Sequence, residues 1–356
     1  MKKFRNSVKT GIICALMIVY LFIVIYESGA VKTAVASSID RCMNVVIPSL
    51  FAFMAVSGFL ISSGLYVKLS APFSVFARLL RIPKQLFSVF LISNIAGYPV
   101  GAKALRTLVE SGNLSKKAAE NMLCFCFGAG PAFFSSIIGL ALFGSVRVGM
   151  IVFLSCFISN LVLAAVICRF TSFAVPDKET KLKVNSLMLM DSVIQAGRSL
   201  AEICVIIVFF STIMAVLDSM GIITAVAGVI SSKNGTAIVS SILELTCATS
   251  IPQPELLLLP IIAALCSFGG LCVILQVNVV LKGTISMKRF LLSRPFAALF
   301  SAVNSIWLSK LMLPETISAI SMQQKVFVKV NNFIPSVCLI LMILMLNVKK
   351  GVEISK

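Results

Sequence analysis

The chain has 356 residues, of which 59% are hydrophobic and only 12% are charged. With a mean hydropathy of +1.04, it is far more apolar than a soluble domain, so we expect an integral membrane protein whose main surroundings are the lipid bilayer. The formal net charge of +18 is not interpreted as a nucleic-acid signal, because basic residues of membrane proteins collect in cytoplasmic loops. No nucleic-acid partner is expected.

Apolar runs predict eight membrane crossings. They are expected at residues 11–27, 38–64, 118–143, 148–170, 199–220, 257–281, 290–312 and 331–348. The first run is long for a signal peptide, so we expect an uncleaved helix. The basic and apolar residues of 66–85 predict an amphipathic helix on the cytoplasmic surface.

Two further apolar segments are broken near their centres. Residues 86–111 contain Gly97-Tyr98-Pro99, and residues 236–256 are interrupted from Cys247 to Pro252. Each half has about 11 residues, which is too short to cross a bilayer, so each segment predicts a re-entrant hairpin of two half-helices.

This topology places most basic residues on the side of the N-terminus. One of the clusters assigned to that side consists of Lys282, Lys288, Arg289 and Arg294. Because the positive side of a membrane protein faces the cytoplasm, both termini are expected to be cytoplasmic.

The order of crossings and hairpins occurs twice, with one glycine-broken crossing in each half (118–143 and 257–281), which predicts an internal repeat. The expected division is 1–34, an N-terminal transmembrane helix; 35–170, the first repeat; 171–198, a cytoplasmic linker; 199–312, the second repeat; and 313–356, a C-terminal transmembrane helix. Three crossings and one hairpin per half make the repeat inverted, which is typical of secondary transporters. The predicted fold is therefore an all-α polytopic membrane protein with a transporter-like inverted repeat.

The glycines and prolines at the breaks predict a binding site. Pro99 suits the first turn of a new half-helix, whose free N–H groups and positive dipole end favour an anion, and Gly128-Ala129-Gly130-Pro131 repeats the pattern. We expect the two helix N-termini to converge. The predicted substrate-binding residues are Asn94, Gly97, Tyr98, Pro99, Gly101, Lys103, Gly128, Gly130 and Gln276. Lys103 and Arg106 share a helix face, and either pair with a carboxylate or reach the cytoplasmic surface.

Glu244 lies in an apolar run, where an ionised carboxylate is costly without a partner. We expect a coupling-ion or proton site there, and the alternative is a structural ion pair. Asp40, Arg41 and Glu202 are interpreted as interface charges or helix-packing pairs.

Catalytic and metal sites are not expected. The sequence has no histidine, and its 11 cysteines are scattered through apolar runs without the spacing of a metal site. Few carboxylates are predicted to be buried, which argues against an intramembrane enzyme. No cofactor is expected.

Three stretches carry a family resemblance: Asn94-Ile95-Ala96-Gly97-Tyr98-Pro99-Val100-Gly101-Ala102-Lys103, Gly128-Ala129-Gly130-Pro131 and Ser267-Phe268-Gly269-Gly270-Leu271. They resemble the YlbJ family of sporulation integral membrane proteins, which belongs to the wider group with a Gate, or nucleoside-recognition, domain. The likeness extends over about residues 35–312. It implies a fold with hairpins, and the transport of dipicolinic acid across the outer forespore membrane. Lys103 would match a lysine of the family's motif, and Tyr98 would stack on an aromatic ring.

The expected function is a secondary-type transporter of a small organic anion, dipicolinic acid, in a bacterial cytoplasmic membrane. A nucleoside or other small-solute carrier of the Gate group is the alternative within the same class. A sporulation membrane scaffold that transports nothing is the alternative outside it. A homo-oligomer is left open.

Overall fold

The computed structural model describes residues 2–171, 173, 185–229, 234–251 and 255–313. The expected crossing at 331–348 lies outside them, as do residues 172 and 174–184 of the expected linker. Every regular element of the described residues is a helix.

The helices of the first half include two π-helices, η1 and η4. In chain order they are α1 (Lys2–Tyr26), α2 (Ser28–Arg41), η1 (Cys42–Val46), α3 (Ile47–Ser62), α4 (Leu65–Ser70), η2 (Ala71–Phe73), α5 (Ser74–Leu79), η3 (Lys84–Leu86), α6 (Phe87–Ile95), α7 (Tyr98–Glu110), α8 (Lys116–Leu123), α9 (Pro131–Phe133), η4 (Phe134–Leu142) and α10 (Val146–Phe170). The predicted surface helix at 66–85 is thus several short helices, and Pro72 stands where α4 gives way to the 3₁₀ turn η2.

The second half has fewer short elements. Its helices are α11 (Ser186–Ser219), α12 (Ile222–Val229), α13 (Gly235–Leu243), η5 (Leu245–Ser250), η6 (Leu256–Leu258), α14 (Leu259–Phe268), α15 (Gly270–Leu281) and α16 (Lys288–Met312). Because α11 begins at Ser186, it starts inside the range expected to be a linker.

Within the described residues, four helical runs are long and apolar enough to cross a membrane: α10, α11, the run from Leu256 to Leu281, and α16. The number rises to six if two bent pairs count as one span each. Thr10–Tyr26 meets Ser28–Asn44 at 90°, and Leu50–Ser62 meets Leu65–Leu79 at 98°. The described structure therefore has four to six candidate spans, fewer than the eight predicted for the whole chain.

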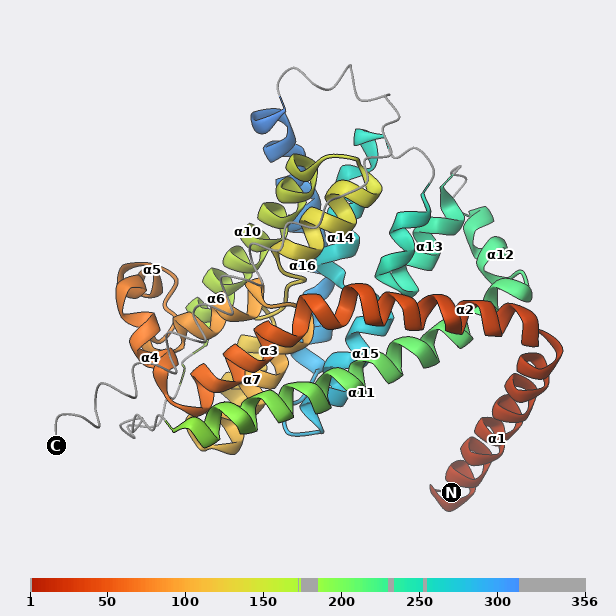
Figure 1. Ribbon diagram of the computed structural model, residues 1–356, viewed down its shortest axis with the longest axis horizontal. Helices are drawn as coiled ribbons and strands as arrows, with labels where there is room; N and C mark the ends of the chain where they lie inside the picture. The colour runs from red at the N-terminus through yellow and green to blue at the C-terminus, as the bar shows by residue number, and fades with distance from the viewer. Residues whose placement is uncertain (1, 172, 174–184, 230–233, 252–254, 314–356) are drawn as a thin grey trace.

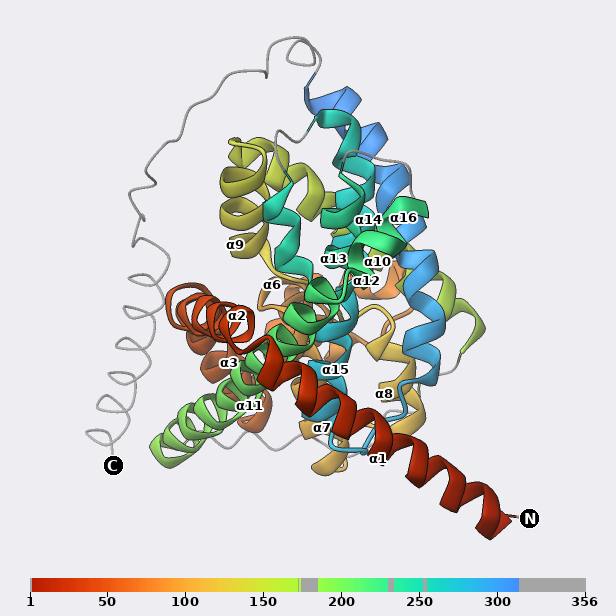
Figure 2. The same ribbon diagram turned by 90° about the vertical axis from the view of Figure 1, so that its right-hand side faces the viewer.

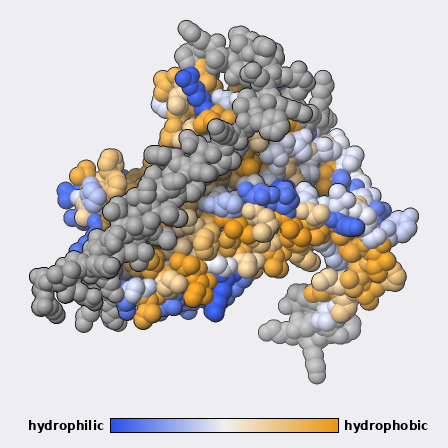
Figure 3. All heavy atoms as spheres, in the orientation of Figure 1, coloured by the Kyte–Doolittle hydropathy of each residue, from blue (hydrophilic) through white to orange (hydrophobic). Residues whose placement is uncertain are grey.

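Apolar side chains also cover much of the outer surface, which suits contact with lipid rather than water (Figure 3). On α1, which extends away from the other helices (Figures 1 and 2), Leu16, Phe22 and Ile25 are exposed. Long apolar helices and an apolar exterior together indicate a membrane-embedded protein.

Two antiparallel helix pairs form the framework. The long rod of α2, η1 and α3 lies along α11, and α10 lies along α16 with α14 beside both (Figure 1). Ser38 and Ser211 share a hydrogen bond of 3.0 Å between the rod and α11. On the other side, a Cβ atom at Gly149 of α10 would lie 2.1 Å from the carbonyl oxygen of Phe134, so only glycine allows η4 to pack this closely.

The helix breaks of the described residues include four at Ala96–Gly97, Cys124–Gly130, Glu244 and Gly269. Three of them fall on the glycines where the sequence predicts breaks. The break in the second hairpin is displaced: α13 ends at Leu243, before the expected interruption from Cys247 to Pro252, and Pro252 lies outside the described residues. Glu244 accounts for the earlier end, because its backbone is extended and its side chain accepts a 3.3 Å hydrogen bond from the N–H of Thr246, in the first turn of η5.

Candidate functional site

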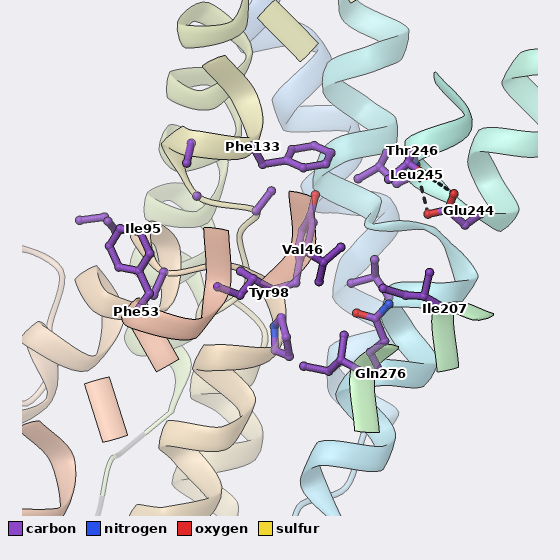
Figure 4. A pocket seen from close by; sticks show the side chains of 18 residues that line it. Val46, Phe53, Ile95, Tyr98, Phe133, Ile207, Glu244, Leu245, Thr246 and Gln276 are labelled. Atoms are coloured by element: carbon purple, nitrogen blue, oxygen red, sulfur yellow. Dashed lines mark hydrogen bonds between the residues drawn. The ribbon is translucent and has the colours of Figure 1, made fainter. Parts of the chain in front are cut away.

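A pocket lies where three of these breaks meet (Figure 4). The breaks contribute Ile95, Ala96, Tyr98, Pro99, Ala129, Gly130, Ala132, Phe133, Glu244, Leu245 and Thr246, and the walls are Val46, Leu50 and Phe53 near and on α3, Ile203 and Ile207 of α11, and Val273 and Gln276 of α15. The pocket is therefore built from both halves of the chain.

The pocket is mainly apolar and small. Water-sized molecules can reach about 100 Å³ of it, and since roughly 10–15 Å³ measured in this way holds one water molecule, there is room for several waters or a small solute. Phe53, Tyr98 and Phe133 offer aromatic surface, whereas Glu244 and Gln276 offer polar groups (Figure 4).

Two helices begin at the pocket, as the sequence predicts. Gly97 has φ 109° and ψ 158° directly before α7, and Gly130 has φ 82° and ψ 153° directly before α9. These backbone conformations are essentially confined to glycine. Pro99 and Gly130 both line the pocket, so the positive ends of α7 and of the α9–η4 helix face the same space.

Glycines also let the first two breaks pack backbone against backbone. A Cβ atom at Gly130 would lie 2.3 Å from the carbonyl oxygen of Ile95, and one at Gly101 would lie 2.3 Å from that of Cys126. A Cβ atom at Gly128 would meet Asn94 less closely, at 3.2 Å from its Oδ1 and 3.3 Å from its backbone. Of the predicted glycines, Gly130 alone is a lining residue; Gly97, Gly101 and Gly128 shape the backbone around the pocket instead.

Asn94 does not line the pocket but holds the two breaks together. Its Nδ2 donates to the carbonyl oxygens of Phe90 (2.9 Å) and Phe125 (3.2 Å), and its Oδ1 accepts from Nδ2 of Asn160 at 2.7 Å. Asn160 also donates to the carbonyl oxygen of Phe127. Unwound backbone in lipid needs such partners. In the sequence, this role of Asn160 is indicated by one feature, an amide side chain within the apolar run 148–170.

The break at Gly269 is stabilised by side chains from elsewhere. The hydroxyl of Tyr98 donates to the carbonyl oxygen of Cys266 at 2.7 Å, and Nη1 of Arg294 donates to that of Ser267 at 3.2 Å. Nη2 of Arg294 donates to the carbonyl oxygen of Cys124, at the end of α8. One arginine thereby serves the exposed carbonyls of two interrupted helices.

The position of Arg294 corrects its assignment to a cytoplasmic cluster. Its side chain is fully buried, with the guanidinium carbon 4.8 Å from the ring centroids of both Phe127 and Phe290. Helix C-terminal ends carry partial negative charge and aromatic faces attract cations, so this position stabilises a charge with no carboxylate paired to it among the described residues. The distribution of basic residues along the sequence does not reveal this burial, because Arg294 closely follows Lys288 and Arg289 and resembles a further loop charge.

Glu244 is 8% exposed and has several partners beside the pocket. Oε2 accepts hydrogen bonds from the hydroxyl of Thr246 and, at 3.7 Å, from the thiol of Cys247. Nη1 of Arg41 lies 3.4 Å from Oε2 and donates to Oγ1 of Thr246 at 2.6 Å. Glu244 thus has an ion-pair partner on α2, Arg41, which the sequence indicates as an interface charge or part of a helix-packing pair.

The remaining predicted polar residues divide between the pocket and its surroundings. Gln276 lines the pocket, and its Nε2 lies 3.4 Å from the sulfur of Cys272. Lys103 does not line it: Nζ donates to the carbonyl oxygen of Gln195 on α11 at 2.8 Å. Lys103 thus joins α7 to α11, away from the aromatic walls.

Fold and site together define a membrane-embedded, all-helical protein whose interrupted helices enclose a small, largely apolar pocket. The chain matches no protein-family model, no curated protein and no solved structure.

Proposed function

We propose that the protein is a secondary-type transporter of a small organic anion, with dipicolinic acid as its substrate. The observation that carries this proposal is the meeting of three helix breaks at one pocket. Non-helical backbone within a membrane is tolerated where it is buried in protein or lines a cavity. Discontinuous helices of this kind form the substrate sites of many secondary transporters.

The chemistry of the pocket supports a flat, anionic solute. Phe53, Tyr98 and Phe133 supply aromatic surface for a ring, and the helix starts at Pro99 and Gly130 supply positive ends for a negative group. Dipicolinate combines an aromatic ring with two carboxylates. Its choice as the substrate rests on the resemblance of Asn94–Lys103 and the other two stretches to the YlbJ family.

The arrangement of helices supports alternating access between two related halves. The first half presents a rod, a broken pair, a second broken pair and a long helix, and the second half follows the same order. The corresponding long elements, α3 with α11 and α10 with α16, pack in opposite directions (Figure 1), as an inverted repeat requires. We infer that residues 35–170 and 199–312 rock against each other around the pocket, in a bacterial cytoplasmic or outer forespore membrane with both termini in the cytoplasm.

A nucleoside is the second candidate substrate. Gln276 and Glu244 both line the pocket, and an amide and a carboxylate beside aromatic side chains can hydrogen-bond the edge of a base while its face is stacked. This reading differs from the first in needing no negative charge on the solute.

Uptake of labelled dipicolinate into proteoliposomes tests the proposal directly. The experiment is run with and without a proton gradient, and with unlabelled dipicolinate or nucleosides as competitors. Saturable uptake that unlabelled dipicolinate blocks is the expected result. Inhibition by nucleosides alone would establish the second candidate, and uptake of neither solute would leave a membrane scaffold as the better description.

A further inference from the structure

The cation nearest to the lining carboxylate is Arg41, not Lys103. Arg41 ends α2 immediately before the π-helix η1, and its side chain is 36% exposed. Nη1 lies 3.4 Å from Glu244 Oε2 and 2.6 Å from Thr246 Oγ1. Both partners line the pocket, so the guanidinium stands directly behind its wall.

The pairing of Arg41 leaves much of its hydrogen-bonding capacity unused. A guanidinium has five N–H donors in a fork that suits two carboxylate oxygens, yet within the described ranges Nη1 makes the hydrogen bonds and Nε is buried without a partner. Charge-assisted pairs of good geometry have N···O distances of about 2.7–2.9 Å. At 3.4 Å, the contact with Glu244 is loose, and a better-placed carboxylate can replace it.

We propose that Arg41 is the residue that binds a carboxylate of the transported solute, and that Glu244 occupies the guanidinium while the pocket is empty. Loading the pocket exchanges one carboxylate for another, so the guanidinium is never left without an anion. This inference rests on the proposed transport of an organic anion and assigns the specificity of that same pocket to a solute with at least one carboxylate.

The exchange also links binding to the contact between the halves. Arg41 belongs to the first half, whereas Glu244 and Thr246 belong to the break between α13 and η5 in the second. When the solute replaces Glu244 at Arg41, one ion pair between the halves is released. If Glu244 competes with the solute for Arg41, removal of Glu244 and removal of Arg41 should have opposite effects on solute binding.

Equilibrium binding to the full-length protein in lipid nanodiscs tests the exchange. The probes are pyridine-2,6-dicarboxylate (dipicolinate) and the uncharged pyridine-2,6-dicarboxamide. The variants are Arg41→Gln, Glu244→Gln and the double variant. Arg78→Gln, on an exposed part of α5, is the matched control. Arg41→Gln should weaken dicarboxylate binding about tenfold to a hundredfold, as expected for loss of a charge-assisted hydrogen bond. Glu244→Gln should tighten it about two- to fivefold, the range of a partly exposed ion pair. Binding of the dicarboxamide should change with neither substitution.

The variants separate the possible failures. Dicarboxylate binding that persists in Arg41→Gln, or that weakens in Glu244→Gln, would overturn the inference and leave the proposed anion transport intact. A wild-type protein that binds no dicarboxylate would overturn both. If Arg41→Gln unfolds because Glu244 has lost its partner, the double variant removes both charges, and its comparison with Glu244→Gln isolates Arg41. The Glu244→Gln variant retains Arg41, so its binding affinity tests the inference whether or not Arg41→Gln folds.

Discussion

The hydroxyl of Tyr98 donates a 2.7 Å hydrogen bond to the backbone carbonyl oxygen of Cys266. This contact joins the first residue of α7, in the first half, to the last turn of α14, in the second. The final carbonyls of a helix have no partner within that helix, and α14 ends at Phe268. A residue that the sequence suggests as a stacking surface is therefore also a structural tie between two breaks.

Replacing Tyr98 with Phe should keep the ring and remove this tie. We expect the free energy of unfolding to fall by about 1 kcal/mol, the typical contribution of a buried hydrogen bond. Thermal unfolding in detergent, followed by exposure of buried cysteines, measures the change. Tyr26→Phe removes a hydroxyl from a side chain that is 87% exposed and should have little effect; an equal loss in both variants would contradict the prediction.

Gly130→Ala should damage the pocket more than a comparable substitution elsewhere. The new Cβ would lie 2.3 Å from the carbonyl oxygen of Ile95, and φ is +82°. Gly112 also has a positive φ, of +73°, but open space around it, so Gly112→Ala reports the strain of the backbone alone, about 1 kcal/mol. We expect Gly130→Ala to lose solute binding and Gly112→Ala to retain it. Comparable binding by the two variants would show that the close approach at Gly130 is dispensable.

Glu244→Gln should uncouple or abolish transport while the protein remains inserted. An amide cannot take part in a coupled protonation or hold a coupling cation as a carboxylate does. Accumulation driven by a proton gradient should disappear, and it is measured in proteoliposomes beside exchange of internal for external solute, which shows whether binding persists. Glu255→Gln, at an exposed glutamate, is the control. Accumulation at the wild-type rate would exclude Glu244 as the coupling residue.

Cys42 and Cys204 should form a cross-link that stops transport. Their thiols lie close enough to interact, one in η1 and the other in α11. Oxidation by diamide removes one hydrogen from each thiol, forms the S–S bond and reduces the diamide. The bond would fasten the first half to the second, so we expect uptake to stop and dithiothreitol to restore it.

Mass spectrometry of the digested protein identifies the Cys42–Cys204 disulfide. Cys204→Ala should remain active in diamide, since it lacks one of the two thiols. Undiminished uptake by a fully cross-linked protein would mean that η1 and α11 do not separate during transport.

Local sequence signals were sufficient for the positions of three breaks. Gly97, Gly130 and Gly269 occupy backbone conformations that other residues rarely adopt, so each of these breaks coincides with a glycine in an apolar run. Gly101 and Gly149 show that such a glycine can also lie within a helix. The break at Glu244 has no such glycine. Its position depends on a side chain that caps Thr246, and the pattern of apolar residues points a few positions too far along the chain.

The partners of the polar residues could not be predicted in the same way. Arg41 meets Glu244 across 203 residues of chain, and Arg294 meets Cys124 across 170. A basic residue near the end of an apolar run has the same local sequence whether it reaches water or bonds to a distant carbonyl. The sequence accordingly predicts Lys103 in the binding site and Arg294 in a loop, whereas Lys103 bonds to the carbonyl oxygen of Gln195 and Arg294 is buried between interrupted helices.

The burial of Arg294 sets an order on how the protein can be assembled in the membrane. An arginine without partners is costly to insert in a bilayer, by about 2.5–3.5 kcal/mol at the centre of a helix and less towards its ends. Arg294, in the second turn of α16, gains compensating carbonyl groups from the ends of α8 and α14, which precede it in the chain. Because synthesis runs from the N-terminus, the carbonyl groups that bind Arg294 are made before Arg294 itself. A newly made α16 becomes stable in the bilayer when the earlier interrupted helices have folded, so its final insertion acts as an intrinsic checkpoint on their correct formation.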